Sequence, residues 1–443
     1  MTIDQNYSLQ AHMLVRNPDD PEALVAQYAI LAQNLEYGKF YLPLAKRAYE
    51  VAPEQITTLF NYASALHRAG HFEQALKLYL KGLNGTDIGW WRGRFLHHVG
   101  VAYRSLNENK KACEYYRRAY EATGDIEILK DAAIATLASG DLQTGFKMFE
   151  IRKECAALKY EKHGGNRNVQ QKLPPHLIYW NGESLEGKSL LIYHEEGHGD
   201  FIQFCRYIPR LRELGAAKIL LTGPTAGLLE LVAANIAIDH IVELGGPFDC
   251  DYVVGSMSIP WRVGIDYASV NGNSYFKSDT IDIPQRGKLN VGLVWRGNPD
   301  YGMDAHRSMA FTELCPLFDL PGVAFYSLQK GATDITAFGF DGFVANMDSF
   351  MDSWIDTAKV VQAMDVIISV DTAVAHLAGA LGKPVFILTT AASDWRWNRN
   401  SEKTAWYDSA RVVRQRKQDD WTPIIANVKD KLRGMIDVRR QAA

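Results

Sequence analysis

The first third of the chain repeats a pattern of small and aromatic residues at helical spacing. In residues 58–83, two amphipathic runs flank a glycine, and a small residue in each run lets the two runs approach closely. The same order of residues returns at 95–120 and at 129–152. The pattern predicts pairs of antiparallel helices, each pair joined by a short turn.

The repeat has the period of a tetratricopeptide array. Its second small position steps from Ala75 to Ala112 to Gly145, and these intervals of 37 and 33 residues bracket the expected period of about 34 residues. We expect residues 84–91 to absorb the longer interval as a loop carrying two tryptophans. An earlier unit ends at 45–53. About four repeats make a stacked solenoid, which we place at residues 1–160.

A polar linker at 161–175 follows, and short apolar runs then alternate with amphipathic runs. Such alternation predicts parallel sheets with helices on their faces. We expect one α/β domain at 161–285 and a second at 286–443. The fold class is therefore α + α/β, an N-terminal α-solenoid followed by two Rossmann-like α/β domains. The expected elements lie at 189–193, 201–215, 217–223 and 227–235, then at 290–299, 323–331, 356–364, 366–370, 372–382 and 384–389, with a last helix at 423–432 that packs back on the sheet.

Residues 193–205 place two glycines and an aspartate between an apolar run and a helix. Parallel sheets bind ligands at the carboxyl ends of their strands, and the free N–H groups of a helix start suit a phosphate or a carboxylate. Asp200 then lies at the floor of an active site. The alternative interpretation is that Asp200 is a simple N-cap, and the local pattern alone favours this alternative.

The second α/β domain repeats the arrangement of strand, loop and helix at 366–388. His376 follows Thr372 by four residues, so both lie on one helix face. Two facing domains with strand-end loops of this kind describe a cleft. The polar and glycine residues near these strand ends are Arg296, Gly297, Asn298, Arg307, Ser308, Asp371, Thr372 and His376.

Composition narrows the class of protein. Apolar residues make up 47% and charged residues 22% of the chain, as in globular proteins. The net charge of −3 gives no sign of a general nucleic-acid or membrane binder. Five scattered cysteines suit reduced thiols in a cytoplasm. We find no signal peptide in the first residues and no apolar run long enough to span a bilayer, so we expect a cytoplasmic protein.

Several segments together resemble a known family. The chain looks like the tetratricopeptide-containing glycosyltransferases related to heptosyltransferases, which share the GT-B fold with O-linked N-acetylglucosamine transferases and bacterial flagellin glycosyltransferases. The resemblance covers roughly residues 20–430, and "SVDTAVAHLAGALGKP" is its most specific part. The other segments that carry it are "EGHGDFIQFCRYIP", "VGLVWRGNP", "RSM", "FYSLQKG" and "DWRW" (394–397).

The resemblance implies roles residue by residue. Asp200 holds the place of the proposed general base. Arg307 matches the basic residue that reaches the nucleotide diphosphate, although heptosyltransferases carry lysine there. The turn Asp371–Thr372–Ala373 matches an Asp-Thr-Gly turn that holds phosphate, with alanine in place of glycine. The donor-binding residues implied are Asn298, Arg307, Ser308, Gln329, Lys330, Asp371, Thr372, Ala373 and His376.

Two parts of this assignment keep an alternative. Gly197, His198 and Gly199 would form the acceptor-side loop, but His198 stands where relatives often carry leucine and is equally interpreted as a surface histidine. Gln329 and Lys330 end a strand and would face the nucleotide base or ribose, or they form a solvated loop.

The chemistry expected needs no cofactor and no metal. A carboxylate takes the proton of the acceptor hydroxyl, while Arg307 and the helix start at Thr372 stabilise the departing nucleotide diphosphate. The Asp-x-Asp of 249–251 looks like a metal-binding motif, and we interpret it as a surface loop. Trp395, Trp397 and Trp406 could shield the cleft or pack the last helix, and packing is the favoured interpretation.

Two functions of different classes fit the sequence. The first is an inverting glycosyltransferase that uses a nucleotide sugar and recruits a protein acceptor on the concave face of the solenoid. The solenoid could instead dock the enzyme while the acceptor is a glycan. The second is a scaffold whose α/β half has lost catalysis. A sugar-nucleotide epimerase ranks below both, because it would not need the repeats.

Overall fold

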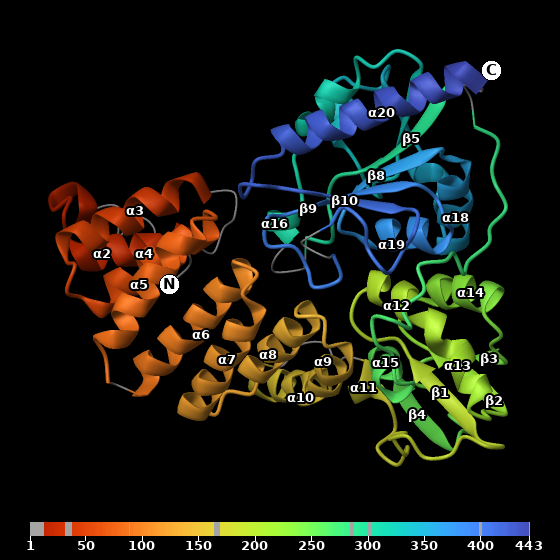
Figure 1. Cartoon of the computed structure of the whole chain (residues 1–443), viewed down its shortest axis with the longest axis horizontal. Coiled ribbons are helices and arrows are strands. Elements are labelled where there is room, and N and C mark those ends of the chain that lie inside the picture. The colour runs from red at the N-terminus through yellow and green to blue at the C-terminus, as the bar shows by residue number, and fades with distance from the viewer. Residues whose placement is uncertain are drawn as a thin grey trace. The chain divides into compact units, whose positions relative to one another are not determined.

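The computed structural model of the protein describes residues 13–31, 38–87, 89–163, 169–283, 288–299, 304–397 and 401–442. Contacts within the chain define two compact units, Met1–Ser139 with Lys417–Asp419 and Gly140–Arg416 with Asp420–Ala443. Residues 1–12, where we expect no signal peptide, lie outside the described residues. Figure 1 shows the elements of both units along the chain.

The described part of the first unit is helical, as the repeat pattern predicts. Ala63 and Ala75 are fully buried where α4 and α5 meet. Gly70 turns between them with φ +79°, a left-handed conformation that favours glycine. The helices are α2 (Pro21–Leu31), α3 (Gly38–Val51), α4 (Ile56–Arg68), α5 (Phe72–Asn84), α6 (Gly89–Ser105), α7 (Asn109–Thr123) and α8 (Glu127–Ala138).

The prediction of a loop at 84–91 is wrong for Gly89, Trp90 and Trp91. Helix α6 already begins at Gly89, so Trp90 and Trp91 belong to its first turn. The physical reason is aromatic packing, because the Trp91 ring lies edge-on to Phe60, with 5.6 Å between ring centroids. Packing of this kind outweighs the turn signal of the preceding residues.

The second unit contains two sheets whose strands are all parallel. The first sheet has the order β3-β2-β1-β4 and the second has the order β10-β9-β8-β5-β6-β7. The strands of the first are β1 (Ser189–Tyr193), β2 (Lys218–Thr222), β3 (His240–Ile241) and β4 (Tyr252–Gly255). Those of the second are β5 (Leu289–Val294), β6 (Val323–Ser327), β7 (Val344–Asn346), β8 (Val366–Val370), β9 (Val385–Thr389) and β10 (Ala410–Arg414).

Helices cover these sheets and complete the predicted α + α/β class. Helix α20 lies along the second sheet (Figure 1) and buries Val428 and Leu432 in the same core as Val291 and Ile368, so the last helix packs back as expected. The α-helices of the second unit are α9 (Leu142–Phe149), α10 (Arg152–His163), α11 (Val169–Lys172), α12 (His198–Phe204), α13 (Ile208–Glu213), α14 (Ala226–Asn235), α15 (Ile259–Arg262), α16 (Asp304–Arg307), α17 (Asp334–Ala337), α18 (Trp354–Ala363), α19 (Ala373–Ala380) and α20 (Thr422–Ala442).

The single helix expected at 201–215 is interrupted. Helix α12 ends at Phe204, a 3₁₀ turn (Cys205–Tyr207) follows, and α13 starts at Ile208. Pro209 explains the break, because proline lacks the N–H that a continuous helix needs and fits best in a first turn. The interruption leaves α12 as a short helix that begins within the segment 194–200, which we call the glycine loop.

The domain boundaries at residues 160 and 285 stay predictions. Residue 160 falls inside α10, and residue 285 lies outside the described residues. The contacts group α9 and α10 with the α/β part of the chain. The buried side chain of Arg152 gives one reason, since it forms an ion pair with Glu195 just after β1.

Candidate active site

Each sheet of the second unit reverses its strand order at one point. The reversal falls between β1 and β4 in the first sheet and between β5 and β8 in the second. Loops that leave the carboxyl ends of strands at such a point open in opposite directions and form a crevice that binds ligands. The residues singled out in the sequence follow β1, β5, β6 and β8, so they lie on the edges where ligands bind.

Asp200 sits in the first turn of α12, but it is not the N-cap. Gly197 is the N-cap, and its N–H donates to Oδ2 of Asp200 at 2.9 Å. The other oxygen, Oδ1, forms an ion pair with Nη2 of Arg396. The simple N-cap interpretation is therefore wrong, because a third-position carboxylate reaches back to Gly197 and a guanidinium holds its free oxygen.

Arg396 is the main site residue that the sequence did not identify. It lies in the loop after β9, and 11% of its side chain is exposed. Its Nη1 donates to Oδ1 of Asp394 at 2.8 Å, and its Nε donates to Oε1 of Gln203 at 2.6 Å. Burial opposes the charged form of Arg396, but Asp200 and Asp394 outweigh it and raise the pKa of the guanidinium. A fixed positive charge therefore lies beside Asp200.

The turn after β8 supplies the other half of the site. Thr372 is the N-cap of α19, and its hydroxyl lies 2.9 Å from that of Ser369. His376 is buried one turn later, with Nδ1 2.8 Å from the Tyr407 hydroxyl and Nε2 4.0 Å from Oδ1 of Asp371. Burial lowers the pKa of His376 well below its usual value, so the imidazole is neutral at physiological pH.

Gly199 lets the part of the site on the first sheet lie close to the part on the second sheet. A Cβ on Gly199 would lie 2.7 Å from Cδ2 of His376 and 3.4 Å from Cα of Ala373, so α12 approaches the start of α19 more closely than any other residue type allows. Figure 1 shows these two short helices next to each other. Both are attached to strands at the reversal points, so the approach places Asp200 near Asp371 and His376.

Arg307 joins the turn after β8 to the loop after β5. Its Nη1 donates to the carbonyl oxygen of Asp371 at 2.9 Å, and its Nε donates to Oδ1 of Asp304 at 2.8 Å. Ser308 donates to the same Asp304 and accepts from the Gly297 N–H at 2.9 Å. A Cβ on Gly297 would lie 2.4 Å from Nη2 of Arg307, so this loop is built around the arginine.

The remaining predicted donor residues lie farther along the same edge. Gln329 uses Oε1 to accept from the N–H groups of Trp295 and Arg296, at 3.2 and 2.9 Å, so it fixes the end of β5. Lys330 pairs with Asp348, 2.9 Å away, and 63% of its side chain is exposed. Asn298 is exposed in the loop after β5. The described side-chain contacts of Gln329 and Lys330 are with the end of β5 and with Asp348, not with Asp200 or His376.

His198 is not a free surface histidine. Its Nε2 lies 3.0 Å from the Thr225 hydroxyl, and its ring lies edge-on to Trp354 at the start of α18, 5.4 Å between centroids. Burial lowers its pKa. His198 is therefore a neutral side chain that connects the glycine loop to α18, one of the helices that cover the second sheet.

The Asp-x-Asp of 249–251 lies at the opposite edge of the first sheet. Asp251 precedes β4 and accepts from the Ser189 N–H and hydroxyl, both at 2.8 Å. These hydrogen bonds, with Lys188, lower its pKa to about 2. The prediction of a surface loop is confirmed, because Asp249 and Asp251 are both exposed. Among the described residues, no group of three or more histidine, cysteine or acidic side chains could hold a metal ion.

Asp371 gives the site an expected pH dependence. Burial and the nearby Asp394 raise its pKa to about 6. An anionic diphosphate beside this carboxyl would favour the protonated form, so binding would take up a proton above pH 6. We expect the affinity for a nucleotide sugar to fall by up to about tenfold between pH 6 and pH 7.5, because a shift of one pKa unit corresponds to a factor of about 10.

Titration calorimetry at several pH values checks this expectation. Asp371→Asn is the matched variant, because it keeps the backbone carbonyl oxygen that accepts from Arg307. The variant should bind with an affinity that is flat over the same range. An equally steep dependence in both proteins would assign the proton to another group.

The sequence contains a weak signal that could have identified Arg396. The segment 394–397 places an arginine between two tryptophans and an aspartate just before them. Trp395, Trp397 and Trp406 are buried, but their rings contact Phe146, Phe204 and His376, so their burial does not confirm packing of the last helix. An arginine between buried tryptophans must itself find buried partners, and this could have marked Arg396 as a candidate.

Two segments of the chain match models of known protein families. Residues 355–422, which span α18, β8, α19, β9 and β10, match the model of glycosyltransferase family 9 (heptosyltransferase). Residues 93–125, in α6 and α7, match a tetratricopeptide repeat. Protein FlbA of Caulobacter vibrioides is 25% identical over 475 residues, covering 96% of this chain and 74% of FlbA.

Solved structures resemble about a third of the chain. A MamA structure from Desulfovibrio magneticus matches with a TM-score of 0.31 and 15% identity, covering 36% of this chain and 88% of that one. A thermophilic tetratricopeptide protein from Thermus thermophilus matches with a TM-score of 0.30 and 21% identity, covering 37% and 84%. In the described part of the chain, no helix has the length and apolarity needed to cross a membrane. These matches, a tetratricopeptide repeat at 93–125 and glycosyltransferase family 9 at 355–422, support a glycosyltransferase.

Proposed function

We propose that the protein transfers a sugar from a nucleotide-sugar donor to an acceptor hydroxyl, with inversion at the anomeric carbon and without a metal. The observation that carries the proposal is the approach of α12 to α19 through Gly199. It places a carboxylate from one sheet next to a helix start and an arginine from the other sheet. This is the arrangement that a displacement between an acceptor and a diphosphate leaving group requires.

The donor diphosphate would bind on the second sheet. The first N–H groups of α19, those of Ala373 and Val374, have no carbonyl four residues earlier within the helix to donate to, and a helix N-terminus favours negative charge. Arg307 lies beside this turn, held by Asp304. Arg296, Gln329 and Lys330 continue the edge toward the end of β6, where we place the nucleoside. Asn298 and Ser308 belong to the same loop cluster, which supports a donor site built from these loops.

The acceptor hydroxyl would lie against Asp200. The carboxylate takes the hydroxyl proton as the oxygen attacks the anomeric carbon, a new C–O bond forms, and the bond to the diphosphate breaks. A single displacement of this kind inverts the anomeric configuration. Arg307 and the α19 start would stabilise the charge that develops on the diphosphate, which supports a reaction without a metal.

The acceptor class rests on the helical repeats. Stacked helix pairs form extended concave surfaces that bind proteins, and we propose that this surface recruits a protein that carries the acceptor hydroxyl. Chemical analysis of the product, after incubation with a labelled donor and candidate proteins, would identify the acceptor.

A thermal-shift screen against UDP-, GDP-, CMP- and ADP-sugars, with and without EDTA, tests the donor proposal. A ligand at about 100 times its Kd that binds only the native state stabilises it by about 2.7 kcal/mol. We expect one nucleotide class to raise the Tm equally in both conditions. A hit that disappears with EDTA would contradict the metal-free reaction, and no hit in the folded protein would contradict the donor proposal.

A further inference from the structure

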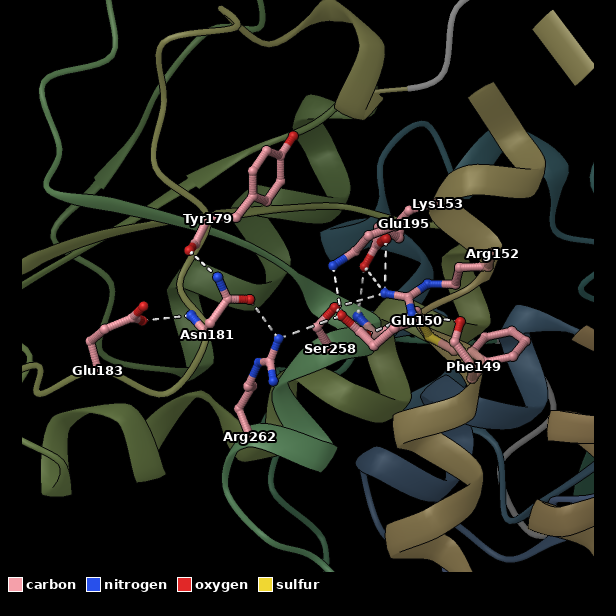
Figure 2. Close-up of polar contacts among 11 residues, drawn as sticks. Phe149, Glu150, Arg152, Lys153, Tyr179, Asn181, Glu183, Glu195, Ser258 and Arg262 are labelled. Carbon is pink, nitrogen blue, oxygen red and sulfur yellow. Dashed lines mark hydrogen bonds and ion pairs between the residues drawn. The ribbon is translucent and has the colours of Figure 1, made fainter. Parts of the chain in front are cut away.

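A buried arginine, Arg152, forms an ion pair with Glu195 in the glycine loop. Arg152, in the first turn of α10, has 3% of its side chain exposed and is surrounded by two carboxylates. Its Nη2 donates to both oxygens of Glu195, at 3.0 and 2.8 Å, and its Nη1 donates to Oε1 of Glu150 at 2.9 Å. Figure 2 shows the guanidinium between these two carboxylates and Ser258.

Glu195 connects this arginine to two strand ends. It follows β1 and precedes Asp200 by five residues in the same loop. Its carboxylate accepts from the Met257 N–H at 3.1 Å, and its own N–H donates to the Ser256 hydroxyl at 3.2 Å, both just after β4. Arg152 and Glu195 thus fill the point where the first sheet reverses its strand order.

The packing leaves room for Glu195 only because a glycine ends β4. A Cβ on Gly255 would lie 1.9 Å from Oε2 of Glu195 and 2.3 Å from its Cδ. The φ of Gly255 is −76°, a value that any residue adopts. An alanine here would therefore displace the glutamate without straining the backbone and without removing a charge.

Each carboxylate of this cluster forms an ion pair with a basic side chain: Glu195 with Arg152, and Glu150 with Arg152 and Lys153. Burial opposes ionisation of Glu150, but Arg152 and Lys153 outweigh it and lower its pKa to about 2. Ser258 donates to Glu150 at 2.7 Å and accepts from Arg152 at 2.8 Å. Well-packed apolar side chains are often as stable as a buried ion pair, so stability alone gives little reason for this arrangement.

We propose that Arg152 and Glu195 are positioning residues that fix the loop 195–200 and thereby the carboxylate of Asp200. A helix that precedes the first sheet thus completes the acceptor side of the site. The proposal rests on the proposed role of Asp200. We therefore expect changes in Arg152 or Glu195 to affect the acceptor side of the site and not donor binding. The reason is that the donor residues lie on the second sheet and make no described contact with Arg152.

The test uses Gly255→Ala, Glu195→Ala and their double variant in the full chain. A displacement of about 1 Å at a reacting group can cost about a hundredfold in rate, so we expect kcat to fall between about tenfold and a hundredfold in each single variant. The KM for the donor should stay within about twofold of the wild-type value. Glu195→Ala makes room for the new methyl group, so the double variant should match it within about twofold.

Arg212→Gln is the matched control. Arg212 pairs with Asp239 at the opposite edge of the same sheet, so its loss should lower the Tm and leave kcat unchanged. Arg152→Lys adds a variant that keeps the charge but cannot bind both carboxylates, and it should retain more activity than Arg152→Met. If Gly255→Ala keeps kcat within twofold, the positioning role is overturned. It is also overturned if Arg212→Gln loses as much kcat for an equal fall in Tm, because activity would then follow stability alone. A wild-type protein without turnover would instead reject the proposed function.

Discussion

Replacing Asp200 with asparagine is expected to lower kcat by about 10² to 10⁴, the range that general acid–base catalysis typically contributes. Asparagine has nearly the same shape and can still accept from the Gly197 N–H, but its NH2 group then faces Arg396 and the ion pair is lost. We therefore expect a lower free energy of unfolding together with the loss in kcat, so the Tm of the variant is measured alongside its turnover. Asparagine cannot take a proton from an acceptor hydroxyl. The donor site lies on the other sheet, so binding of the nucleotide sugar should change by less than about twofold, as expected for an interaction made only in the transition state.

Steady-state kinetics and titration calorimetry on the same preparation check this result. Asp394→Asn is a useful comparison, since Asp394 also pairs with Arg396 but lies outside the glycine loop. It should lose less activity than Asp200→Asn. Equal turnover of wild-type and Asp200→Asn protein would show that another group takes the proton.

Replacing Arg396 with glutamine is expected to destabilise the fold and to lower activity together. The guanidinium contacts Asp200, Asp394 and Gln203. Removing one partner of a buried ion pair leaves uncompensated charge and typically costs about 3–5 kcal/mol. We expect a reduction of this size in the free energy of unfolding, together with a loss in kcat because Asp200 is no longer held.

Chemical denaturation and turnover assays on Arg396→Gln and Arg396→Lys measure the two effects. Lysine keeps the charge but cannot reproduce the planar set of donors, so its effects should be intermediate. Arg433→Gln is the control, since Arg433 forms an exposed pair with Asp430 that should contribute less than about 1 kcal/mol. Wild-type stability in Arg396→Gln would contradict the assigned contacts.

Local pattern predicted most of the fold because each element is specified by nearby residues. The apolar runs at 189–193 and 366–370 are β1 and β8 with the same bounds. The short strand β3, with both residues exposed, carries no such pattern. The helix expected at 201–215 broke at Pro209, where the loss of one donor outweighs a continuous apolar face.

The site was only partly predictable for a related reason. Strand-end position identified Asp200, Arg307 and His376, because parallel sheets place such loops on one edge. The partner of Asp200 lies 196 residues away, and Arg152 is separated from Glu195 by 43 residues. Pairings over these distances follow from tertiary packing, which leaves no period or spacing in the sequence.

We propose that one site combines a donor edge on the second sheet with a carboxylate from the first. Calorimetric titration of the best nucleotide sugar against wild-type, Asp200→Asn and Arg307→Gln proteins tests this arrangement. We expect wild-type and Asp200→Asn to bind alike, while Arg307→Gln loses about tenfold or more in affinity, since hydrogen bonds to charged groups contribute about 1.5–3 kcal/mol. Unchanged binding in Arg307→Gln, or loss of binding in Asp200→Asn alone, would show that the two sheets do not form such a site.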